Sequence, residues 1–372
     1  ERDKNEELSF LKNTCIAYTN GVFINWRSLF GSYNEKILLP SYPWQRNYYL
    51  LNDNTNNDAL VASNNTQAMR SFVNSYIKLN TELPAYLWQT AINLIDFPYL
   101  EHHKVSNQII FPAAAFFEII NETSKQISTD ESITIQNFSI HNALLLEDGK
   151  NKTVQILIQQ EIGNKYLFSI DSINEDESIN HCKGVLQFKK SIHNINDKPV
   201  EYNRIITKQQ HYDATIAMDL QYDTSFQLIE QINSNQNIFN SIISTNHQIQ
   251  QETAEYNFHP TLLDACFQTF LTAIYSKEKD VLYIPASCKE FQFIHPLNTD
   301  LNIETIVEIK SYKTNQIIGN IKILDEQKNI LAIGNGFAFE RVDKQAAKTL
   351  DDIYYTTNWE KITLKNNLNS SE

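Results

Sequence analysis

The sequence predicts an α+β protein built from two copies of one plan, each a long apolar helix followed by an antiparallel sheet. Two observations predict this class. From Leu83 onward, short apolar runs of strand length, several alternating in polarity, are separated by polar turns. Two apolar stretches of helix length, near residues 112–126 and 258–275, each precede such a series of runs. An order of elements that occurs twice indicates an internal repeat of architecture.

The composition favours a folded protein of several units and argues against some partners. The chain has 372 residues, and because a domain commonly holds ~100 to 200 residues, we expect two or three folding units. A hydrophobic content of 42% is sufficient for a buried core. The formal charge of −13 argues against nucleic acid as a partner, since phosphate neutralisation needs clustered lysine and arginine.

Signals for targeting and for nucleotide cofactors are missing from the sequence. We find no signal peptide and no apolar run as long as a membrane span, so no membrane partner is expected. Four widely spaced cysteines form no C-x-x-C pair and predict reduced thiols in a cytoplasmic protein. With 8 glycines and no G-x-S-x-G, P-loop or G-x-G-x-x-G motif, no nucleotide cofactor is expected.

Changes in composition divide the chain into five segments. A helix-like run at residues 8–18, followed by Pro40 and Pro43, is typical of an upstream linker, and the Asn-rich residues 53–66 are typical of a flexible tether. The charged start and polar end of the chain are typical of cut points within something longer. The predicted segments are an upstream linker at 1–52, a tether at 53–82, a first unit at 83–215, a second unit at 216–342 and an exit linker at 343–372.

Runs of alternating polarity predict the strands of both units. Residues 203–217 show no clear pattern, and we interpret them as a bridge between the units. The predicted strands are SITIQNFSI, TVQILIQQEI, KYLFSIDSI and CKGVLQFKK in the first unit, and VLYIPASCKEFQFI, NIETIVEIKSY, QIIGNIKIL and NILAIGNGFAFERV in the second.

The stretch from Tyr99 to Ile120 carries the first candidate for chemistry. Pro112 favours the start of a helix, because its missing N–H would have no intrahelical partner in the first turn. The sequence therefore predicts strand, turn, strand and an apolar helix, with His103 nine residues before the helix start. A histidine near a helix N-terminus suits proton abstraction beside a carbonyl, since free N–H groups accept developing negative charge.

The second predicted helix carries a carboxyl group that could be the partner of this histidine. Asp264 and Gln268 are spaced i and i+4 and therefore share one face of the helix. If the two units met at a pseudo-twofold junction, His103 could abstract an α-proton and a protonated Asp264 could protonate a leaving hydroxyl. Burial would favour that protonation state, because it raises the pKa of a carboxyl.

Simpler interpretations of these residues remain open at this point. A single histidine is more often a surface or core residue than a base, and Asp264 could instead bond its own helix or a nearby backbone group. A metal site at Glu101, His102 and His103 is not expected, because adjacent side chains diverge and no H-E-x-x-H spacing follows. His259 before the second helix is most simply a helix-entry residue.

Two motifs resemble those of the dehydratase domains of modular polyketide synthases. HHKVSNQIIFP resembles the family's H-x-x-x-G-x-x-x-x-P motif, with His103 and Pro112 at its histidine and proline, and HPTLLDACFQ resembles its second motif, with Asp264 and Gln268. Further segments resemble the family in the same order: LIDFPYLEHH, HCKGVLQF, YDTSFQ and YIPASCKEFQF, with GVFINWRSLF and LLPSYPWQRNYYL as a post-acyltransferase linker and IYYTTNWE as the exit.

This resemblance implies a double hotdog fold and a hydro-lyase. Such a domain removes water from a β-hydroxyacyl chain held on the phosphopantetheine of an acyl carrier protein and gives an α,β-unsaturated thioester, with no bound cofactor. It implies His103 as base, Asp264 as acid and Gln268 as the residue that positions Asp264. The implied substrate-binding residues are Asn107, Pro112, Ala113, Tyr222, Phe226 and Pro285. The implied partners are the carrier protein, neighbouring synthase domains and a second copy of the chain.

The sequence departs from the family pattern at two places. The motif glycine is Asn107, the non-glycine residue type that best tolerates positive φ. The family's Y-G-P-x-F element begins Tyr222-Asp223-Thr224, which adds a charge at a position where relatives line the substrate channel. Because ring-closing and double-bond-shifting relatives also depart from these motifs, a pyran-forming cyclase or an isomerase is one alternative. A structural domain without turnover is another.

Overall fold

The structure, a computed structural model, describes residues 6–19, 22, 24–30, 71–128, 132–161, 163–174, 177–188, 200–245, 247–252, 255–279, 281–295, 302–313 and 315–342. The chain divides into two compact units, Glu1–Thr66 and Gln67–Glu372. The first contains α1 (Glu6–Thr19) and α2 (Trp26–Phe30), and α1 confirms the helix predicted at residues 8–18. The rest of the predicted upstream linker and tether up to residue 70, with Pro40 and Pro43, and the exit linker at 343–372 lie outside the described residues.

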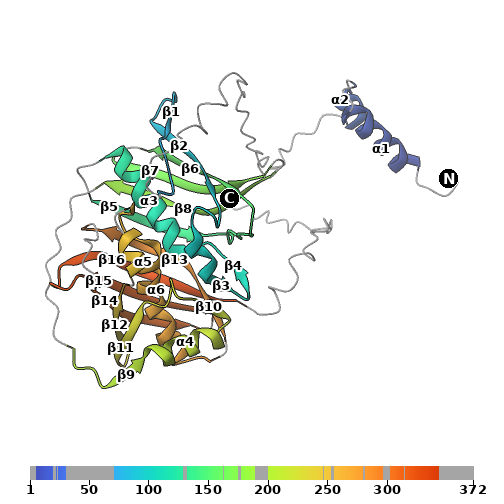
Figure 1. The fold of residues 1–372 in the computed structure, drawn as a ribbon. Helices are drawn as coiled ribbons and strands as arrows, with labels where there is room; N and C mark the ends of the chain where they lie inside the picture. Colours follow the sequence, from blue (N-terminus) through green and yellow to red (C-terminus); the bar gives the residue numbers. More distant parts are fainter. Residues whose placement is uncertain are drawn as a thin grey trace, which may run out of the picture. The chain divides into compact units, whose positions relative to one another are not determined.

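The second unit is built on one antiparallel sheet of 13 strands in the order β1-β2-β6-β7-β8-β5-β13-β16-β15-β14-β12-β11-β9 (Figure 1). Its first half consists of β1 (Ile77–Leu79), β2 (Ala85–Ile92), β5 (Ile133–Ile140), β6 (Lys152–Gln160), β7 (Lys165–Ile173) and β8 (Ser178–Phe188). Its second half consists of β9 (Arg204–Thr207), β11 (Ile229–Asn235), β12 (Ile238–Ser244), β13 (Leu282–Phe293), β14 (Asn302–Lys313), β15 (Gln316–Leu324) and β16 (Ile330–Val342).

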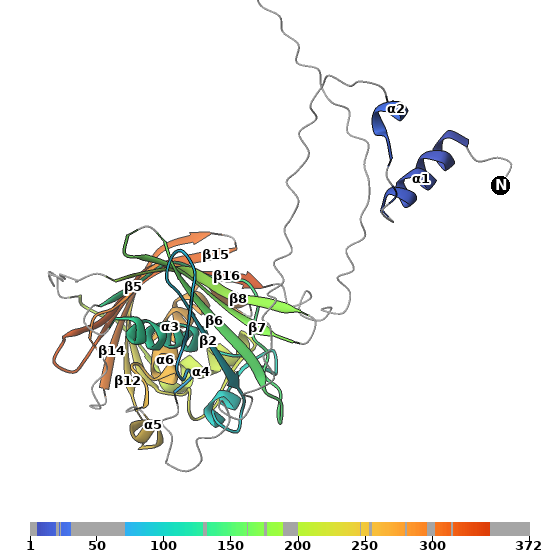
Figure 2. The ribbon, with the colours of Figure 1, turned by 90° about the horizontal axis from the view of Figure 1, so that it is seen from above.

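Each half of the sheet curves around one central helix (Figure 2). The first helix is α3 (Ala113–Ile127) and the second is α6 (Pro260–Tyr275), and the two helices pack against each other. Phe117 of α3 and Phe267 of α6 meet edge to face with their ring centroids 5.6 Å apart. The halves are continuous because β5 pairs with β13 in register, for example Ile133 with Phe293. The predicted plan of two helices, each wrapped by antiparallel strands, is confirmed.

The strand predictions from alternating polarity are confirmed for eight strands, with small differences at their ends. KYLFSIDSI and QIIGNIKIL match β7 and β15 residue for residue, whereas β8 begins at Ser178, four residues before the predicted start. Alternation predicts these strands well because one face of each packs on a helix, as the burial of every second residue of β6 and β14 shows.

A small second sheet carries the stretch around His103. It has the order β10-β3-β4, with β3 (His103–Val105), β4 (Gln108–Ile109) and β10 (Leu220–Tyr222), and the 3-10 helix η1 (Pro98–His102) leads into it. Ser106 and Asn107 at the β3–β4 turn both have positive φ, 48° and 66°, which is typical of a type I′ hairpin. The predicted order of strand, turn, strand and helix is confirmed, and Asn107 occupies the left-handed region expected of it.

Residues 203–217 contain two elements that the polarity pattern did not reveal. They form β9 and the helix α4 (Lys208–Ala217), and α4 begins with a capping box in which Thr207 and Gln210 exchange side-chain and backbone hydrogen bonds. β9 pairs with β11, so these residues join the second half of the sheet. We therefore propose a junction between the halves before residue 203 rather than at 215, and a first half that begins by Phe72, which is fully buried. The remaining helix is α5 (His247–Glu252).

Two glutamates on α3, the fully buried Glu118 and the half-buried Glu122, make the stability of this fold sensitive to pH. Glu118 accepts hydrogen bonds from the backbone N–H groups of Asn257 (2.7 Å) and Phe258 (3.1 Å), just before α6, and so ties the two central helices together. Burial raises the pKa of Glu118 to about 8, and it raises the pKa of Glu122, one turn later, to about 8 as well. Each carboxyl therefore holds a proton in the folded state over a pH range in which the unfolded chain has released it.

Replacement of Glu122 by glutamine is expected to weaken the pH dependence of stability. Between the ordinary pKa of 4.5 and the folded pKa of about 8, the folded state of the wild type binds more protons, so its stability falls as pH rises. The loss is at most ~1.4 kcal/mol per pH unit for each such carboxyl, and glutamine cannot titrate. Urea denaturation at pH 6.5 and pH 8 should show a smaller difference between the two values in Glu122→Gln.

Stability is compared at pH 6.5 and pH 8 because, below pH 6.5, buried histidines change the free energy of unfolding with pH in the opposite direction. Burial lowers the pKa values of His211 and His259, and such groups add stability as pH rises towards 6.5. Glu147→Gln alters an exposed carboxyl and should keep the pH dependence of the wild type. The same pH dependence in Glu122→Gln as in the wild type would contradict the prediction.

Candidate active site

His103 is held in one tautomer at the start of β3. Its Nδ1 atom lies 2.8 Å from the carbonyl oxygen of Ile110, and because a carbonyl only accepts, Nδ1 carries the hydrogen. The hairpin turn makes this bond possible, since it folds β4 and residue 110 back beside β3. The side chain is 9% exposed, and its Nε2 atom keeps a free lone pair. His103 is therefore arranged as a base.

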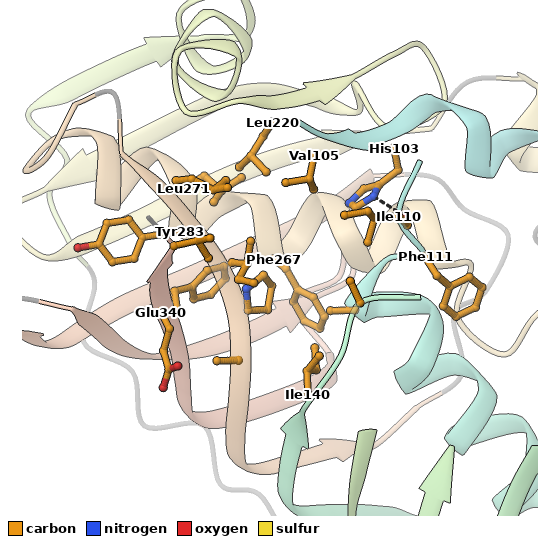
Figure 3. Close-up of a pocket in the computed structure, with 18 of the residues that line it drawn as sticks. His103, Val105, Ile110, Phe111, Ile140, Leu220, Phe267, Leu271, Tyr283 and Glu340 are labelled. Atoms are coloured by element: carbon orange, nitrogen blue, oxygen red, sulfur yellow. Dashed lines mark hydrogen bonds between the residues drawn. The ribbon is translucent and has the colours of Figure 1, made fainter. Parts of the chain in front are cut away.

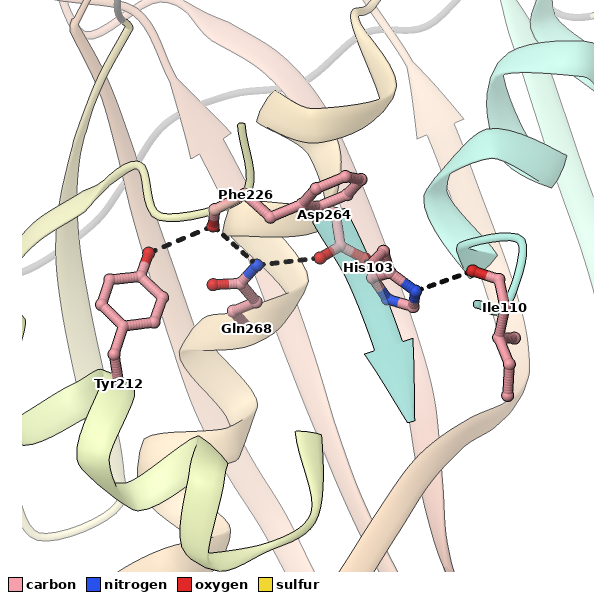
Figure 4. Close-up of polar contacts among 6 residues, drawn as sticks. All are labelled: His103, Ile110, Tyr212, Phe226, Asp264 and Gln268. Carbon is pink, nitrogen blue, oxygen red and sulfur yellow. Dashed lines mark hydrogen bonds and ion pairs between the residues drawn. The ribbon is translucent and has the colours of Figure 1, made fainter. Parts of the chain in front are cut away.

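Asp264 faces this histidine from the second turn of α6. Its Oδ1 atom lies 3.9 Å from Nε2 of His103, and Gln268 donates a hydrogen bond of 2.9 Å from Nε2 to the other carboxyl oxygen, Oδ2 (Figure 4). Burial raises the pKa of Asp264, although the nearby His103 and the bond from Gln268 oppose the increase. The carboxyl of Asp264 thus faces the lone pair on Nε2 of His103, at a distance that leaves room for a reacting group.

Two aromatic residues fix the orientation of the His103 ring. Tyr222 lies opposite His103 in the antiparallel pairing of β10 with β3, with 5.4 Å between ring centroids. Phe226 follows in the turn after β10, and its ring centroid lies 5.2 Å from that of His103. The backbone carbonyl of Phe226 also accepts a hydrogen bond from Nε2 of Gln268 (3.1 Å). One short segment therefore supports both the base and the residue that holds the acid.

The pair lies on the wall of a cavity of about 430 Å³ between the two halves (Figure 3). Most of the surface of this acyl cavity, as we call it, is apolar. Phe267 and Leu271 of α6 line it together with Phe116 of α3 and with Tyr283 at the start of β13. It extends to Glu340 and Arg341 on β16, where Arg341 forms an ion pair with Glu278. Its volume and lining suit a small acyl chain.

The structure brings most of the predicted site residues together. Ala113, Tyr222 and Pro285 line the acyl cavity with His103, Asp264 and Gln268. The other three predicted substrate-binding residues support it from outside the lining: Asn107 forms the hairpin turn, Pro112 precedes the first turn of α3, and Phe226 packs against His103.

The predicted charge at Asp223 does not enter the acyl cavity. Asp223 lines a separate polar pocket of about 290 Å³ with Glu101, His102 and Lys104. Its side chain accepts a hydrogen bond from the backbone N–H of Thr224, and its backbone N–H donates to the carbonyl of His102. The expectation that Asp223 adds a charge to the substrate channel is therefore wrong, because Asp223 lines the polar pocket and not the acyl cavity.

Three contributions to the site were not predicted from the sequence. They are the carbonyl of Ile110, the carbonyl of Phe226 and the hydroxyl of Tyr212, which donates to the Phe226 carbonyl (3.2 Å) and accepts from the backbone N–H of Ile229 (3.0 Å). Backbone acceptors carry no sequence signal. Tyr212 lies on α4, and the T-x-x-Q pattern of the Thr207–Gln210 capping box could have revealed that helix.

The described residues contain neither a group of three or more histidine, cysteine, aspartate or glutamate side chains arranged for a metal ion, nor a helix long and apolar enough to cross a bilayer.

Two family descriptions match the chain. Residues 77–173 match the family described as polyketide synthase dehydratase domain, and residues 196–349 match the one described as polyketide synthase dehydratase N-terminal domain. Together the matches cover about two thirds of the chain and include both His103 and Asp264.

Curated relatives include fungal polyketide synthases. The chain is 24% identical over 293 residues to the highly reducing polyketide synthase lcsB of Purpureocillium lilacinum, which covers 74% of the chain and 11% of that protein. It is 27% identical over 238 residues to the low-reducing polyketide synthase drtA of Aspergillus calidoustus, which covers 57% of the chain and 10% of that protein. The chain thus spans about a tenth of the length of these relatives.

Solved structures of polyketide synthase dehydratase domains share the fold. The dehydratase domain from the CurF module of curacin polyketide synthase superposes with a TM-score of 0.67 at 24% identity, covering 74% of this chain and 100% of that one. Two CurK dehydratase structures at 25% identity, with TM-scores of 0.66 and 0.65, each cover 74% of this chain and 99% of theirs. They are described as inactive mutants, one with a histidine replaced by phenylalanine and the other with an aspartate replaced by asparagine. The α+β double hotdog fold is confirmed, and the chain belongs to the polyketide synthase dehydratase family.

Proposed function

We propose that this chain removes water from a β-hydroxyacyl chain carried on the phosphopantetheine of an acyl carrier protein and releases an α,β-unsaturated thioester. It would thus act as a hydro-lyase within a polyketide synthase. The observation that carries this proposal is the pairing of His103 and Asp264, 3.9 Å apart, on the wall of the acyl cavity. Such a pair supplies a base and an acid at one place, as an elimination of water requires.

In the first step, Nε2 of His103 takes the α-proton of the thioester. The hydrogen bond from Nδ1 to the carbonyl of Ile110 keeps Nε2 unprotonated and pointed at the acyl cavity. The electron pair of the broken C–H bond moves towards the thioester carbonyl. Ala113, at the start of α3, lines the same cavity, and the first N–H groups of a helix have no intrahelical partner, so they can accept this charge.

In the second step, Asp264 protonates the hydroxyl group as its carbon–oxygen bond breaks. Oδ2 accepts the hydrogen bond from Gln268, so the proton of the acid is on Oδ1, the atom that faces His103. Water leaves with this proton, and the double bond forms between the α- and β-carbons. The imidazolium of His103 and the carboxylate of Asp264 then face each other, and transfer of the proton between them restores the starting state.

The partners and location belong to the same proposal. The chain matches only a short part of its large relatives, which supports neighbouring synthase domains as partners. The proposal adds an acyl carrier protein and a second copy of the chain. Three of the cysteines, Cys182, Cys266 and Cys288, are buried free thiols, which supports a reducing, cytoplasmic environment. No bound cofactor is needed for either proton transfer.

Nothing among the described residues favours ring closure, double-bond migration or a purely structural role. Asn107 keeps the hairpin turn despite its side chain, since its φ of 66° is in the left-handed region, and Asp223 lies outside the acyl cavity. Both members of the acid–base pair are present and face each other.

The function is tested with 3-hydroxyacyl thioesters of several chain lengths, on a carrier protein and on pantetheine, by following the loss of 18 mass units. We expect dehydration, together with the reverse hydration of the enoyl product. Failure to dehydrate any of these substrates, with ring closure of a hydroxy-enoyl thioester, would contradict the proposal and favour the cyclase.

Activity is expected to fall at alkaline pH because Asp264 must be protonated. Burial raises its pKa, so the acid persists above the pH at which an ordinary aspartic acid ionises, and kcat/KM should decrease as pH rises through that higher pKa. Removal of the hydrogen bond in Gln268→Leu should shift this alkaline limb to higher pH, since the bond from Gln268 lowers the pKa. The measurement is kcat/KM from pH 5 to 9 in both proteins. If the alkaline limb lay at the same pH in Gln268→Leu as in the wild type, this would contradict the assignment of the limb to Asp264.

A further inference from the structure

The orientation of the Gln268 amide decides which carboxyl oxygen of Asp264 carries the acidic proton. Nε2 of Gln268 lies between two acceptors, Oδ2 of Asp264 at 2.9 Å and the carbonyl of Phe226 at 3.1 Å. If the amide were flipped, its oxygen would face the Phe226 carbonyl, and both would be acceptors. The amide nitrogen must therefore face Asp264, and the amide oxygen, Oε1, must point away from Asp264.

On that side, Gln268 meets a histidine for which the reaction as described has no role. Oε1 of Gln268 and Nε2 of His211 are both buried, and neither has another hydrogen-bond partner of good geometry among the described residues. The two side chains interact, since hydrogen bonding with Gln268 partly offsets the lowering of the His211 pKa. The two atoms left over form a matching acceptor and donor.

The tautomer of His211 makes it the donor of this pair. Because Oε1 of Gln268 can only accept, a bond between it and Nε2 of His211 requires the ring hydrogen on Nε2. Nδ1, which lies 2.7 Å from Oγ1 of Thr272 one turn after Gln268 on α6, then accepts from the threonine hydroxyl. His211 is fully buried on α4, which packs against α6. Burial lowers its pKa to about 4, so the ring stays neutral at the pH of turnover.

We propose that His211 is a positioning residue of the active site: it holds the amide of Gln268 in the orientation that directs the acidic proton of Asp264 towards His103. The chain of contacts runs from Thr272 through His211 and Gln268 to Asp264. It crosses from α6 to α4 and back to α6, and neither His211 nor Thr272 lines the acyl cavity. This role rests on the proposed dehydration, which the experiment below separates from it.

Loss of the His211 donor is expected to change the chemical step and leave substrate binding alone. In His211→Phe an aromatic ring remains, but only the Phe226 carbonyl still opposes a turn of the Gln268 amide oxygen towards Asp264. The acid can then place its proton on Oδ2, away from His103, and kcat should fall about tenfold, the effect of one hydrogen bond. KM should stay within about twofold of the wild-type value, because the acyl cavity is unchanged.

The direction in which the alkaline limb of the kcat/KM profile shifts in His211→Phe separates a positioning role from simple loosening of the core. The titratable groups around Asp264 are His103, Tyr212, Tyr222 and Cys266, and the ring next to His211 on its own helix is Tyr212. Loss of the Gln268 bond raises the pKa of Asp264, so the limb should move to higher pH. Loosening would instead admit water, weaken the effect of burial and move the limb to lower pH.

Matched variants complete the test. His211→Gln supplies an amide N–H at a similar reach and should recover most of the lost kcat. Thr272→Val removes the hydroxyl that orients His211 and should reproduce part of the loss. Thr269→Val is the control. Thr269 lies one turn before Thr272 on α6, and its hydroxyl is bonded to Ser241 instead of His211. This variant makes the same chemical change as Thr272→Val outside the chain of contacts and should behave as the wild type.

The carboxyl 13C resonance of Asp264, assigned with Asp264→Asn, gives a readout that needs no substrate. Its titration midpoint should be higher in His211→Phe than in the wild type. If the wild type fails to dehydrate but this shift occurs, the proposed function is wrong and the positioning role stands. An unchanged or lower midpoint, or a His211→Gln variant as impaired as His211→Phe, would overturn the proposal for His211.

Discussion

Replacement of His103 by phenylalanine is expected to abolish dehydration, with a loss of kcat on the order of a thousandfold or more, because Nε2 of His103 is the proposed base that faces Asp264. Phenylalanine preserves the ring contacts with Tyr222 and Phe226 and removes the Nε2 lone pair. The hydrogen bond to the carbonyl of Ile110 is also lost, at a cost of about 1 kcal/mol of stability. Steady-state dehydration and thermal unfolding, measured on the same preparations, separate the two effects.

The neighbouring histidine provides the control for this variant. His102 is bonded to Ser225 through Nδ1 (2.8 Å) and lines the polar pocket beside Asp223. His102→Phe makes the same chemical change one residue away and should retain most of the activity. If His103→Phe kept more than about a tenth of wild-type kcat, or if His102→Phe were the inactive variant, the base would have been assigned to the wrong residue.

Replacement of Asp264 by asparagine is expected to stop dehydration while leaving the base competent. Asparagine can still accept the hydrogen bond from Gln268, but it has no acidic proton for the departing hydroxyl. The loss of kcat should reach a hundredfold or more, on the order expected for a general acid. A saturated acyl thioester in deuterated water offers a partial reaction, because His103 alone can exchange its α-hydrogens for deuterium.

The exchange reaction makes the two variants distinguishable. Asp264→Asn should continue to exchange α-hydrogens, whereas His103→Phe should not. The double variant should be little worse than His103→Phe in dehydration, because groups that act as a unit are not additive. Asp223→Asn, a carboxyl outside the acyl cavity, should remain active in both assays. Loss of exchange in Asp264→Asn together with retained dehydration would contradict the assigned roles.

Much of the fold could be predicted from local patterns, for reasons that particular strands illustrate. β7 and β15 match their predicted ranges because one face of each is buried, and burial imposes a period of two on the sequence. β9, α4, β11 and β12 were not predicted. Their polar residues are stabilised by contacts distant in sequence, such as the hydrogen bond between Ser241 and Thr269 of α6, which leave no periodic signal.

The sequence by itself determined which residues were candidates for the site. A histidine before a proline-started helix and an aspartate with a glutamine one turn later in a second apolar helix made His103, Asp264 and Gln268 candidates, and the resemblance to the dehydratase family implied their roles. Only the tertiary structure decided the distance of 3.9 Å between base and acid, the tautomer set by the carbonyl of Ile110 and the contact of Gln268 with His211. These features join residues up to 161 positions apart in the sequence. Their contacts depend on backbone carbonyls and side-chain rotamers, which cannot be deduced from the identity of a residue.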